Sequence, residues 1–105
     1  MTDKRLVLTT AGSSEEAQRI ASALVEQRLA ACVNIISGVE SVYRWQGKID
    51  VTRECLLVIK TTEAAFASLR DAIQKIHSYE VPEILSIPIE SGSDAYLRWI
   101  DESVT

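Results

Sequence analysis

The chain has 105 residues, of which 47% are hydrophobic and 25% charged, a balance that excludes a disordered protein and fits one domain over residues 1–105. The net charge of −4 comes without a basic stripe, so we expect no nucleic-acid partner. No apolar run approaches the length of a membrane span, and residues 1–5 show no secretory signal. We therefore expect a cytoplasmic protein with no membrane partner.

Hydrophobic periodicity and breaker residues predict alternating strands and helices. Ser13 and Glu16 form a capping box, and the helical apolar stripe that follows reaches Leu29. The predicted elements, in chain order, are a strand at 6–10, a helix opened by Ser13, strand segments at 32–36 and 39–45, a reversal at 46–48, a returning strand at 54–60, a helix capped by Thr62 that ends before Pro82, a strand at 84–89 and a helix capped by Ser93.

This order is β-α-β-β-α-β with an extra C-terminal helix. Two split β-α-β units predict an α+β, ferredoxin-like fold with an antiparallel sheet, and right-handed crossovers place the first two helices on one face of it. Pro88 donates no backbone hydrogen bond, so its strand is expected at an edge or to end there.

Two features of the strands point beyond a monomer. The run 55–59 is continuously apolar, so both sheet faces need covering, and either the third helix or a partner subunit supplies the second cover. A straight strand over 31–46 would run about 50 Å, against a diameter near 35 Å for a globule of this size. The long hairpin therefore bends at Ser37-Gly38 or projects as an arm, whose Tyr43 and Trp45 would then lie against a neighbour.

Polar side chains gather where the second helix pattern gives way to the last strand, in the stretch 77–84. His77 is either a cation stabilising the helix end or a metal ligand. Glu80 and Glu83 are either solvated or act beside His77, as its orienting partners or as ligands of a hard cation. Tyr79 is interpreted as a core or interface anchor rather than an acid.

Other candidate side chains lie outside this stretch. Cys32 and Cys55 sit in apolar runs and are interpreted as reduced core thiols. Trp45 is an interface anchor or a lid over a ligand, and Lys60 either meets an anion in a cleft or extends over the surface. No phosphate-binding glycine loop, nucleophile elbow or close cysteine pair is present, so the sequence does not predict an enzyme.

The chain resembles the CutA divalent-cation tolerance family from about Leu6 to Ile100. The matching segments, several and in the family's order, are Arg28-Leu29-Ala30-Ala31-Cys32-Val33-Asn34-Ile35-Ile36, Gly38 through Ile49, Lys60-Thr61-Thr62, His77-Ser78-Tyr79-Glu80-Val81-Pro82-Glu83-Ile84 and Tyr96-Leu97-Arg98-Trp99.

The resemblance implies a homotrimer with long hairpins packed between subunits, and a role in tolerance of copper and other divalent metals, with no enzyme reaction attached. In the bacterial members to which copper binding is attributed, a cysteine ends the first strand and paired histidines stand at the end of the second helix. Here these positions read Thr9 and Ile76-His77, so we expect weak copper or zinc binding at an intersubunit cleft. The expected metal residues are His77, Cys32 and Glu83.

A second hypothesis follows from the family's similarity in architecture to the P-II signalling proteins. The chain is then a trimeric small-ligand sensor, or a signalling scaffold, without direct metal binding. Its ligand or interface cleft is expected to contain Lys60, Tyr79, Glu80 and Trp45, with Glu83 beside them.

Overall fold

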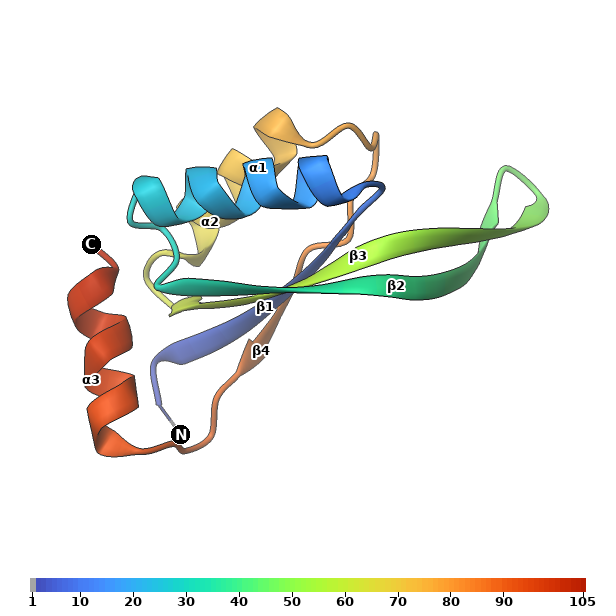
Figure 1. Ribbon diagram of the computed structural model, residues 1–105. Helices are drawn as coiled ribbons and strands as arrows, with labels where there is room; N and C mark the ends of the chain where they lie inside the picture. The colour runs from blue at the N-terminus through green and yellow to red at the C-terminus, as the bar shows by residue number, and fades with distance from the viewer. Residues whose placement is uncertain (1) are drawn as a thin grey trace.

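The structure, a computed structural model, describes residues 2–105 and confirms the predicted α+β, ferredoxin-like order (Figure 1). Four strands form one antiparallel sheet in the order β2-β3-β1-β4, which leaves β4 and its Pro88 at an edge as predicted. The elements are β1 Lys4–Ala11, α1 Ser14–Glu26, β2 Cys32–Trp45, β3 Lys48–Thr62, α2 Phe66–Ile76, β4 Leu85–Pro88 and α3 Asp94–Ser103.

Helices α1 and α2 pack side by side on one face of the sheet, where they bury the main core (Figure 1). The core residues come from alternate positions of β1 and β3, from the inward stripes of both helices and, for Ala30, from the segment between α1 and β2: Val7, Ala11, Ala17, Ile20, Leu24, Ala30, Cys55, Leu57, Ile59, Leu69 and Ile73. Of the two thiols that the sequence placed in the core, Cys55 is buried there, whereas Cys32 is only half-buried and lies outside the core cluster.

Two helix ends differ from the prediction. The apolar stripe of α1 continues to Leu29, but the helix ends at Glu26, because Arg28 adopts a left-handed backbone (φ 59°) that terminates it. Thr62 does not cap α2; its hydroxyl accepts a hydrogen bond from the backbone N–H of Ala65 at 3.2 Å. It therefore stabilises a turn that precedes the helix.

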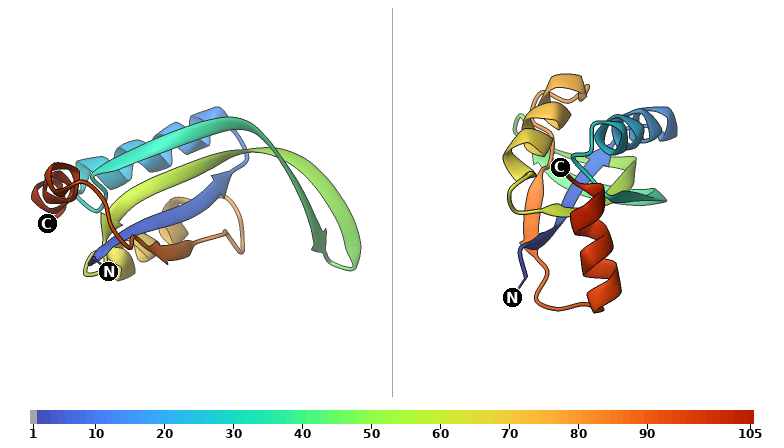
Figure 2. Two further views of the ribbon diagram at one scale, coloured as in Figure 1. Left: turned by 90° about the horizontal axis from the view of Figure 1, so that it is seen from below. Right: turned by 90° about the vertical axis from the view of Figure 1, so that its left-hand side faces the viewer.

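Strands β2 and β3 pair over almost their whole length and extend beyond the sheet as a curved arm (Figure 2). The strand β3 begins at Lys48 rather than at Glu54. A register shift between Ile36 and Val39, with Gly38 at φ 74°, marks the bend. The hairpin therefore both bends near Ser37-Gly38 and projects, which gives the molecule its long dimension of 44 Å against 25 and 22 Å.

The third helix does not cover the second face of the sheet. Its Ile100 and Val104 pack with Ala31 and Ala65 at one end of the sheet (Figures 1 and 2). On the face away from α1 and α2, large side chains stay exposed, including Leu85 at 54% and Ile87 at 43%. No helix among residues 2–105 is both long enough and apolar enough to cross a membrane.

Candidate functional site

A cavity of about 570 Å³ lies between the arm, from Glu54 at its base to Trp45 near its tip, and the segment that joins α2 to β4. The arm curves toward the side on which this segment lies (Figure 2). We call this cavity the elbow pocket; its lining residues are Thr10, Ser41, Val42, Tyr43, Trp45, Glu54, Tyr79, Glu80, Val81 and Glu83. The stretch 77–84 that the sequence singled out thus forms one wall of a real cavity.

The two walls of the elbow pocket are joined by a hydrogen bond between Tyr79 and Glu54. The Tyr79 hydroxyl donates to Glu54 Oε2 at 2.6 Å. Burial, reinforced by this hydrogen bond to a carboxylate, raises the pKa of Tyr79 well above its ordinary value. The phenol therefore stays protonated and keeps its role as donor. A Cβ at Gly12 would stand 3.2 Å from the same hydroxyl, so glycine leaves room for it.

Glu16 holds the segment that carries Tyr79. It belongs to the predicted capping box, in which Ser13 Oγ accepts from the Glu16 N–H at 3.1 Å. Its own carboxylate turns inward, accepting from the Ser78 N–H at 2.8 Å and from the Gly12 N–H at 3.4 Å. Burial alone would raise the pKa of Glu16, but these hydrogen bonds outweigh it and leave the pKa below its usual value.

His77 is buried and uses both ring nitrogens inside the chain. Nε2 lies 2.7 Å from the Thr10 carbonyl oxygen and must donate to it, while Nδ1 accepts from the Tyr79 N–H at 3.0 Å. These partners define the neutral Nε2–H tautomer. His77 is thus neither a solvated cation at the helix end nor a ring with a free lone pair for a metal, and its contacts position Tyr79 instead.

Cys32 and Lys60 lie together, away from the elbow pocket. They are paired across β2 and β3, and Lys60 Nζ stands 3.8 Å from Cys32 Sγ and also contacts Asn34. Lys60 pairs with Leu6 on β1, four positions from the Thr10 that binds His77, which is about 13 Å of strand. Within one copy of the chain, Cys32 therefore lies far from His77, and Lys60 lies far from Tyr79.

The two positions where copper-binding relatives were expected to differ also point away from the pocket. Thr9 is fully buried, and its hydroxyl has no hydrogen-bond partner among residues 2–105. Ile76 is 37% exposed at the end of α2. In the described part of the chain, no three His, Cys, Asp or Glu side chains converge into a metal-binding cluster.

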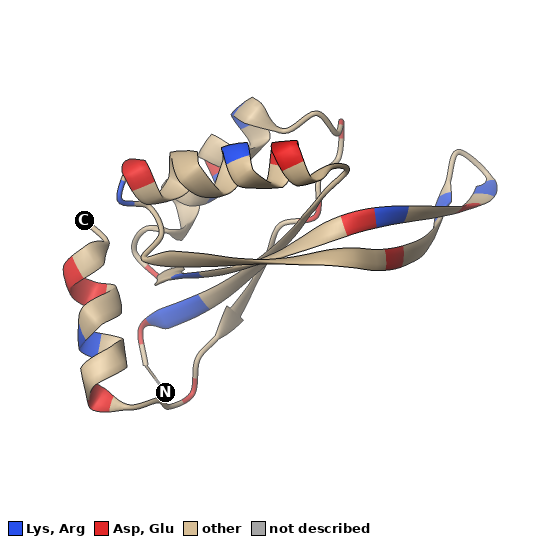
Figure 3. Ribbon diagram, in the orientation of Figure 1, with Lys and Arg blue, Asp and Glu red and all other residues tan. Residues whose placement is uncertain are grey.

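Three carboxylates line the elbow pocket, and its lining among residues 2–105 contains no Lys or Arg. Glu54, Glu80 and Glu83 line it, and none of them forms an ion pair with any residue in 2–105. The α2–β4 segment is acidic, the base of the arm carries an acidic and a basic position side by side on β3, and basic positions also lie near the arm's tip (Figure 3).

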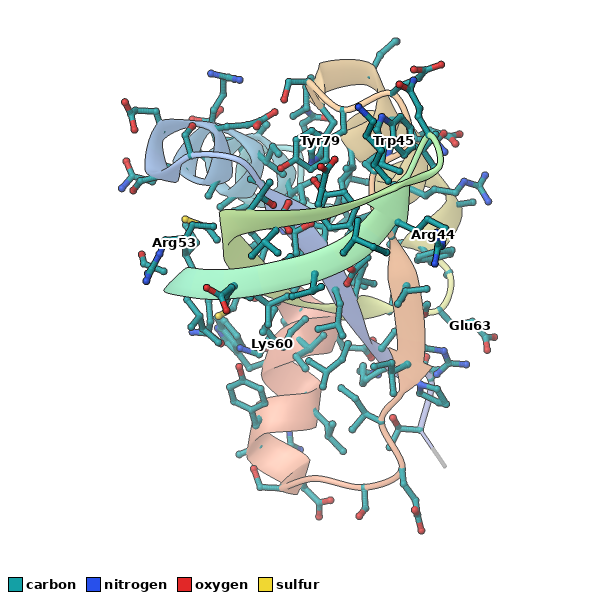
Figure 4. All side chains as sticks on the ribbon, turned by 90° about the vertical axis from the view of Figure 1, so that its right-hand side faces the viewer. Arg44, Trp45, Arg53, Lys60, Glu63 and Tyr79 are labelled. Carbon is teal, nitrogen blue, oxygen red and sulfur yellow. The ribbon has the colours of Figure 1, made fainter. Side chains whose placement is uncertain are left out.

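The nearby arginines point elsewhere. Successive strand side chains point to opposite faces, so Arg44 and Arg53 face away from the side on which Tyr43, Trp45 and Glu54 lie. In Figure 4, Trp45 and Tyr79 lie on the same side of the molecule, and the labelled Arg44 and Arg53 extend outward from it. Lys48 pairs with Trp45 and so shares its face of the arm, but it does not line the pocket, whose lining contains aromatic residues and carboxylates.

The sequence identified Trp45, Tyr79, Glu80 and Glu83 as candidates, and the structure brings all four to the elbow pocket. Sequence reasoning did not identify Glu54 as a site residue, nor did it place Tyr43 in a pocket. The signal for Glu54 was a carboxylate preceding the apolar run 55–59 of a central strand, where a buried charge is unusual.

A family model described as the CutA1 divalent ion tolerance protein matches residues 5–103. A Thermus thermophilus divalent-cation tolerance protein CutA is 49% identical over 100 residues, covering 95% of this chain and 97% of the relative. The chloroplastic protein CutA of Arabidopsis thaliana is 42% identical over 98 residues, but this chain spans only 54% of that relative's length.

Solved structures agree with these sequence matches. The Thermus thermophilus protein superposes with a TM-score of 0.95 at 48% identity, covering 97% of this chain and 99% of that one. CutA from Xylella fastidiosa superposes with a TM-score of 0.97 at 36% identity, covering 99% and 100%. The long curved hairpin thus belongs to a shared fold.

Proposed function

The chain belongs to the CutA1 divalent ion tolerance protein family, and from this premise we propose that it acts as a homotrimer that binds divalent cations weakly at the carboxylates of the elbow pocket. The family is named for metal tolerance rather than for a catalytic activity. The observation that carries the proposal is the set of three glutamates without a cationic partner around one cavity.

Glu83 is the direct ligand in this proposal, with Glu80 beside it. Both are exposed on the wall opposite Glu54, so an ion can reach them from solvent while keeping part of its water shell. Binding through few carboxylates and several waters is weak, and it suits copper or zinc only at high concentration. The absence of a three-ligand cluster in residues 2–105 supports this weak mode.

His77 and Cys32 take indirect roles. His77 positions Tyr79 through the hydrogen bond at Nδ1, and to bind a metal it would first have to give up that bond or the one to Thr10. Cys32 sits beside Lys60 near the far end of the sheet, so it would meet further ligands only from a second copy.

The open sheet face supports the trimer. Ile36, Leu85 and Ile87 are each more than two-fifths exposed there, and exposed apolar patches of this kind mark protein interfaces. The projecting arm adds Val42 and Ile49, exposed by 64% and 58%, to the surface that a neighbour would cover. The trimer number itself comes from the family resemblance.

Competitive titration of reduced protein with Cu(II) and Zn(II) against chelators of known affinity tests the metal site. We expect saturable weak binding that Glu83→Gln weakens by about tenfold, ~1.4 kcal/mol. Glu90→Gln, an exposed glutamate outside the pocket, is the matched control, and His77→Ala should cost less than Glu83→Gln. Binding that is indifferent to Glu83, or absent at millimolar metal, would refute the direct-binding role.

A second candidate function is a trimeric small-ligand sensor. The volume of the elbow pocket and its aromatic walls, Tyr43 and Trp45, favour it, because ligand sites combine apolar surface with a few polar groups. Thermal shift against a metabolite panel separates it from metal binding. The cytoplasmic location stays a prediction, since relatives are named as chloroplastic and periplasmic proteins.

A further inference from the structure

We propose that oxidation by a peroxide joins Cys32 to Lys60 through a sulfur–nitrogen bond, a sulfenamide, which links β2 to β3 covalently. The two residues lie together on the sheet, away from the elbow pocket, and the chemistry involves no metal. The inference therefore goes beyond the proposed function and does not depend on it. Every group that carries it belongs to one chain, so it needs no residue from a neighbouring subunit.

The strand register holds the thiol and the amine in contact. Cys32 and Lys60 lie directly opposite each other in the antiparallel ladder of β2 and β3. The side chains of such a pair leave the sheet on the same face, with Cβ atoms about 5 Å apart. Here Lys60 Nζ stands 3.8 Å from Cys32 Sγ. The flexible lysine side chain closes the remaining gap by rotating about its own bonds, so the bridge needs no shift of the strand register.

A third group, the Tyr96 phenol, meets the thiol from α3. Partial burial, together with the Cys32 thiol beside it, raises the pKa of Tyr96 above its ordinary value, so the phenol stays protonated. In Figure 4 the labelled Lys60 lies at the end of the sheet where α3 is found. Cys32 thus sits among β2, β3 and α3 of its own chain. It is half-buried and outside the core cluster, so hydrogen peroxide, little larger than water, can reach its sulfur.

The reaction balances with hydrogen peroxide as the only oxidant. In the first step the Cys32 sulfur attacks one peroxide oxygen, the O–O bond breaks, and the products are a sulfenic acid and water. In the second step the Lys60 amine, having released its extra proton to solvent, attacks the sulfur. The S–N bond forms, the S–O bond breaks, and the hydroxyl leaves as water with a proton from the nitrogen. In sum, one thiol, one amine and one peroxide give one sulfenamide and two waters, with the sulfur oxidised and the peroxide reduced.

The other thiol of the chain cannot compete with Lys60 for the sulfenic acid. Cys55 precedes Lys60 by five positions on β3, which is about 16 Å of strand, and it lies in the core on the face that the helices cover. A disulfide needs Cα atoms within about 7 Å of each other. The amine that contacts Cys32 is therefore the nucleophile within reach. An external thiol that attacks the bridged sulfur releases the amine, and a second one restores Cys32, so the modification is reversible.

The test is treatment of the reduced, assembled protein with one equivalent of hydrogen peroxide, followed by tryptic digestion and mass spectrometry. We expect a peptide that joins the Cys32 and Lys60 segments, two hydrogens lighter than their sum and uncleaved after Lys60. Dithiothreitol should restore the two separate segments, and Cys55 should stay reduced as an internal control. A disulfide between the Cys32 residues of two copies, a sulfinic acid at Cys32 without a bridge, or an unreacted Cys32 would overturn the inference.

Lys60→Arg keeps the positive charge and removes the nucleophilic amine, because a guanidinium group does not lose its proton in proteins. This variant should form no bridge, and dimedone should instead capture the sulfenic acid at Cys32. Lys75→Arg, at an exposed lysine on α2, is the matched control and should give the bridge within twofold of the wild-type yield. If Lys60→Arg fails to fold, the peptides of the wild-type protein still decide. A sulfenamide of unchanged yield in folded Lys60→Arg would overturn the assignment of Lys60.

Discussion

The Tyr79 hydroxyl and the Glu54 carboxylate are joined by a 2.6 Å hydrogen bond that ties the α2–β4 segment to the base of the arm. Glu54 is distant in sequence from Tyr79. It belongs to β3, one of the two strands that form the arm. Through this bond the sheet, the arm and the loop form one site.

Tyr79→Phe should lower the free energy of unfolding by about 1–3 kcal/mol, because it leaves the buried Glu54 carboxylate without its donor. Urea unfolding at fixed protein concentration measures the change, since assembly makes stability depend on concentration. Tyr43→Phe is the control, because no hydrogen bond of the Tyr43 hydroxyl exists among residues 2–105. Equal stability of the Tyr79→Phe variant and the wild type would show that the bond contributes nothing.

Glu16 should make stability depend on pH in the acid range. Its folded pKa lies below the ordinary 4.5, so its contribution is complete above that value and is lost as pH falls through the lower folded pKa. Glu16→Gln should therefore be less stable than wild type at pH 7, and the difference should shrink below pH 4.5. Thermal unfolding across this range checks it, with the exposed neighbour Glu15→Gln as control. A difference that does not change with pH would contradict this role.

Thr9 and Thr61 form a matched pair of buried threonines with opposite expectations. The Thr9 hydroxyl has no partner within residues 2–105, whereas the Thr61 hydroxyl donates to the Leu29 carbonyl at 2.6 Å. Thr9→Val should be neutral or stabilising, and Thr61→Val should cost about 0.5–1.5 kcal/mol because it removes the hydrogen bond to the half-buried Leu29 carbonyl. Chemical denaturation measures both. A loss of stability in Thr9→Val as large as that in Thr61→Val would disprove the difference.

The open sheet face should be an assembly surface. Ile87→Glu places a charge on this face, at the edge strand β4, and should convert the proposed trimer to smaller species, because an unpaired charge is costly to bury. Light scattering after size exclusion measures the mass. Val25→Glu replaces a similarly exposed apolar residue, 43% exposed on α1, and should keep the wild-type mass. An unchanged mass for Ile87→Glu would place the interface elsewhere.

Periodicity and caps predicted the order of elements because those signals are local. Ser13 and Ser93 both cap helices as expected. The end of α1 was missed because the apolar stripe continues past Glu26 to Leu29, while the left-handed Arg28, not glycine, ends the helix. The strand β3 starts early because cross-strand pairing with β2 extends it through polar residues.

The site was predicted only where its residues are neighbours in sequence. The stretch 77–84 held Tyr79, Glu80 and Glu83, but the inward turn of His77 depends on the Thr10 carbonyl, which no local pattern reveals. The sequence analysis assigned Cys32 and Lys60 to the site because a thiol and an amine can bind a metal or an anion. The strand register places both of them away from the elbow pocket. Glu54 was missed because its importance comes from burial and from a partner distant in sequence.

Anomalous diffraction from crystals of the protein grown with Zn(II), recorded at the zinc edge, tests the proposed metal site most directly. We expect a peak in the elbow pocket within coordination distance of Glu83, and an undisturbed His77 hydrogen-bonded to Thr10 and Tyr79. A peak on His77 Nδ1 or on Cys32, with no density at Glu83, would contradict it.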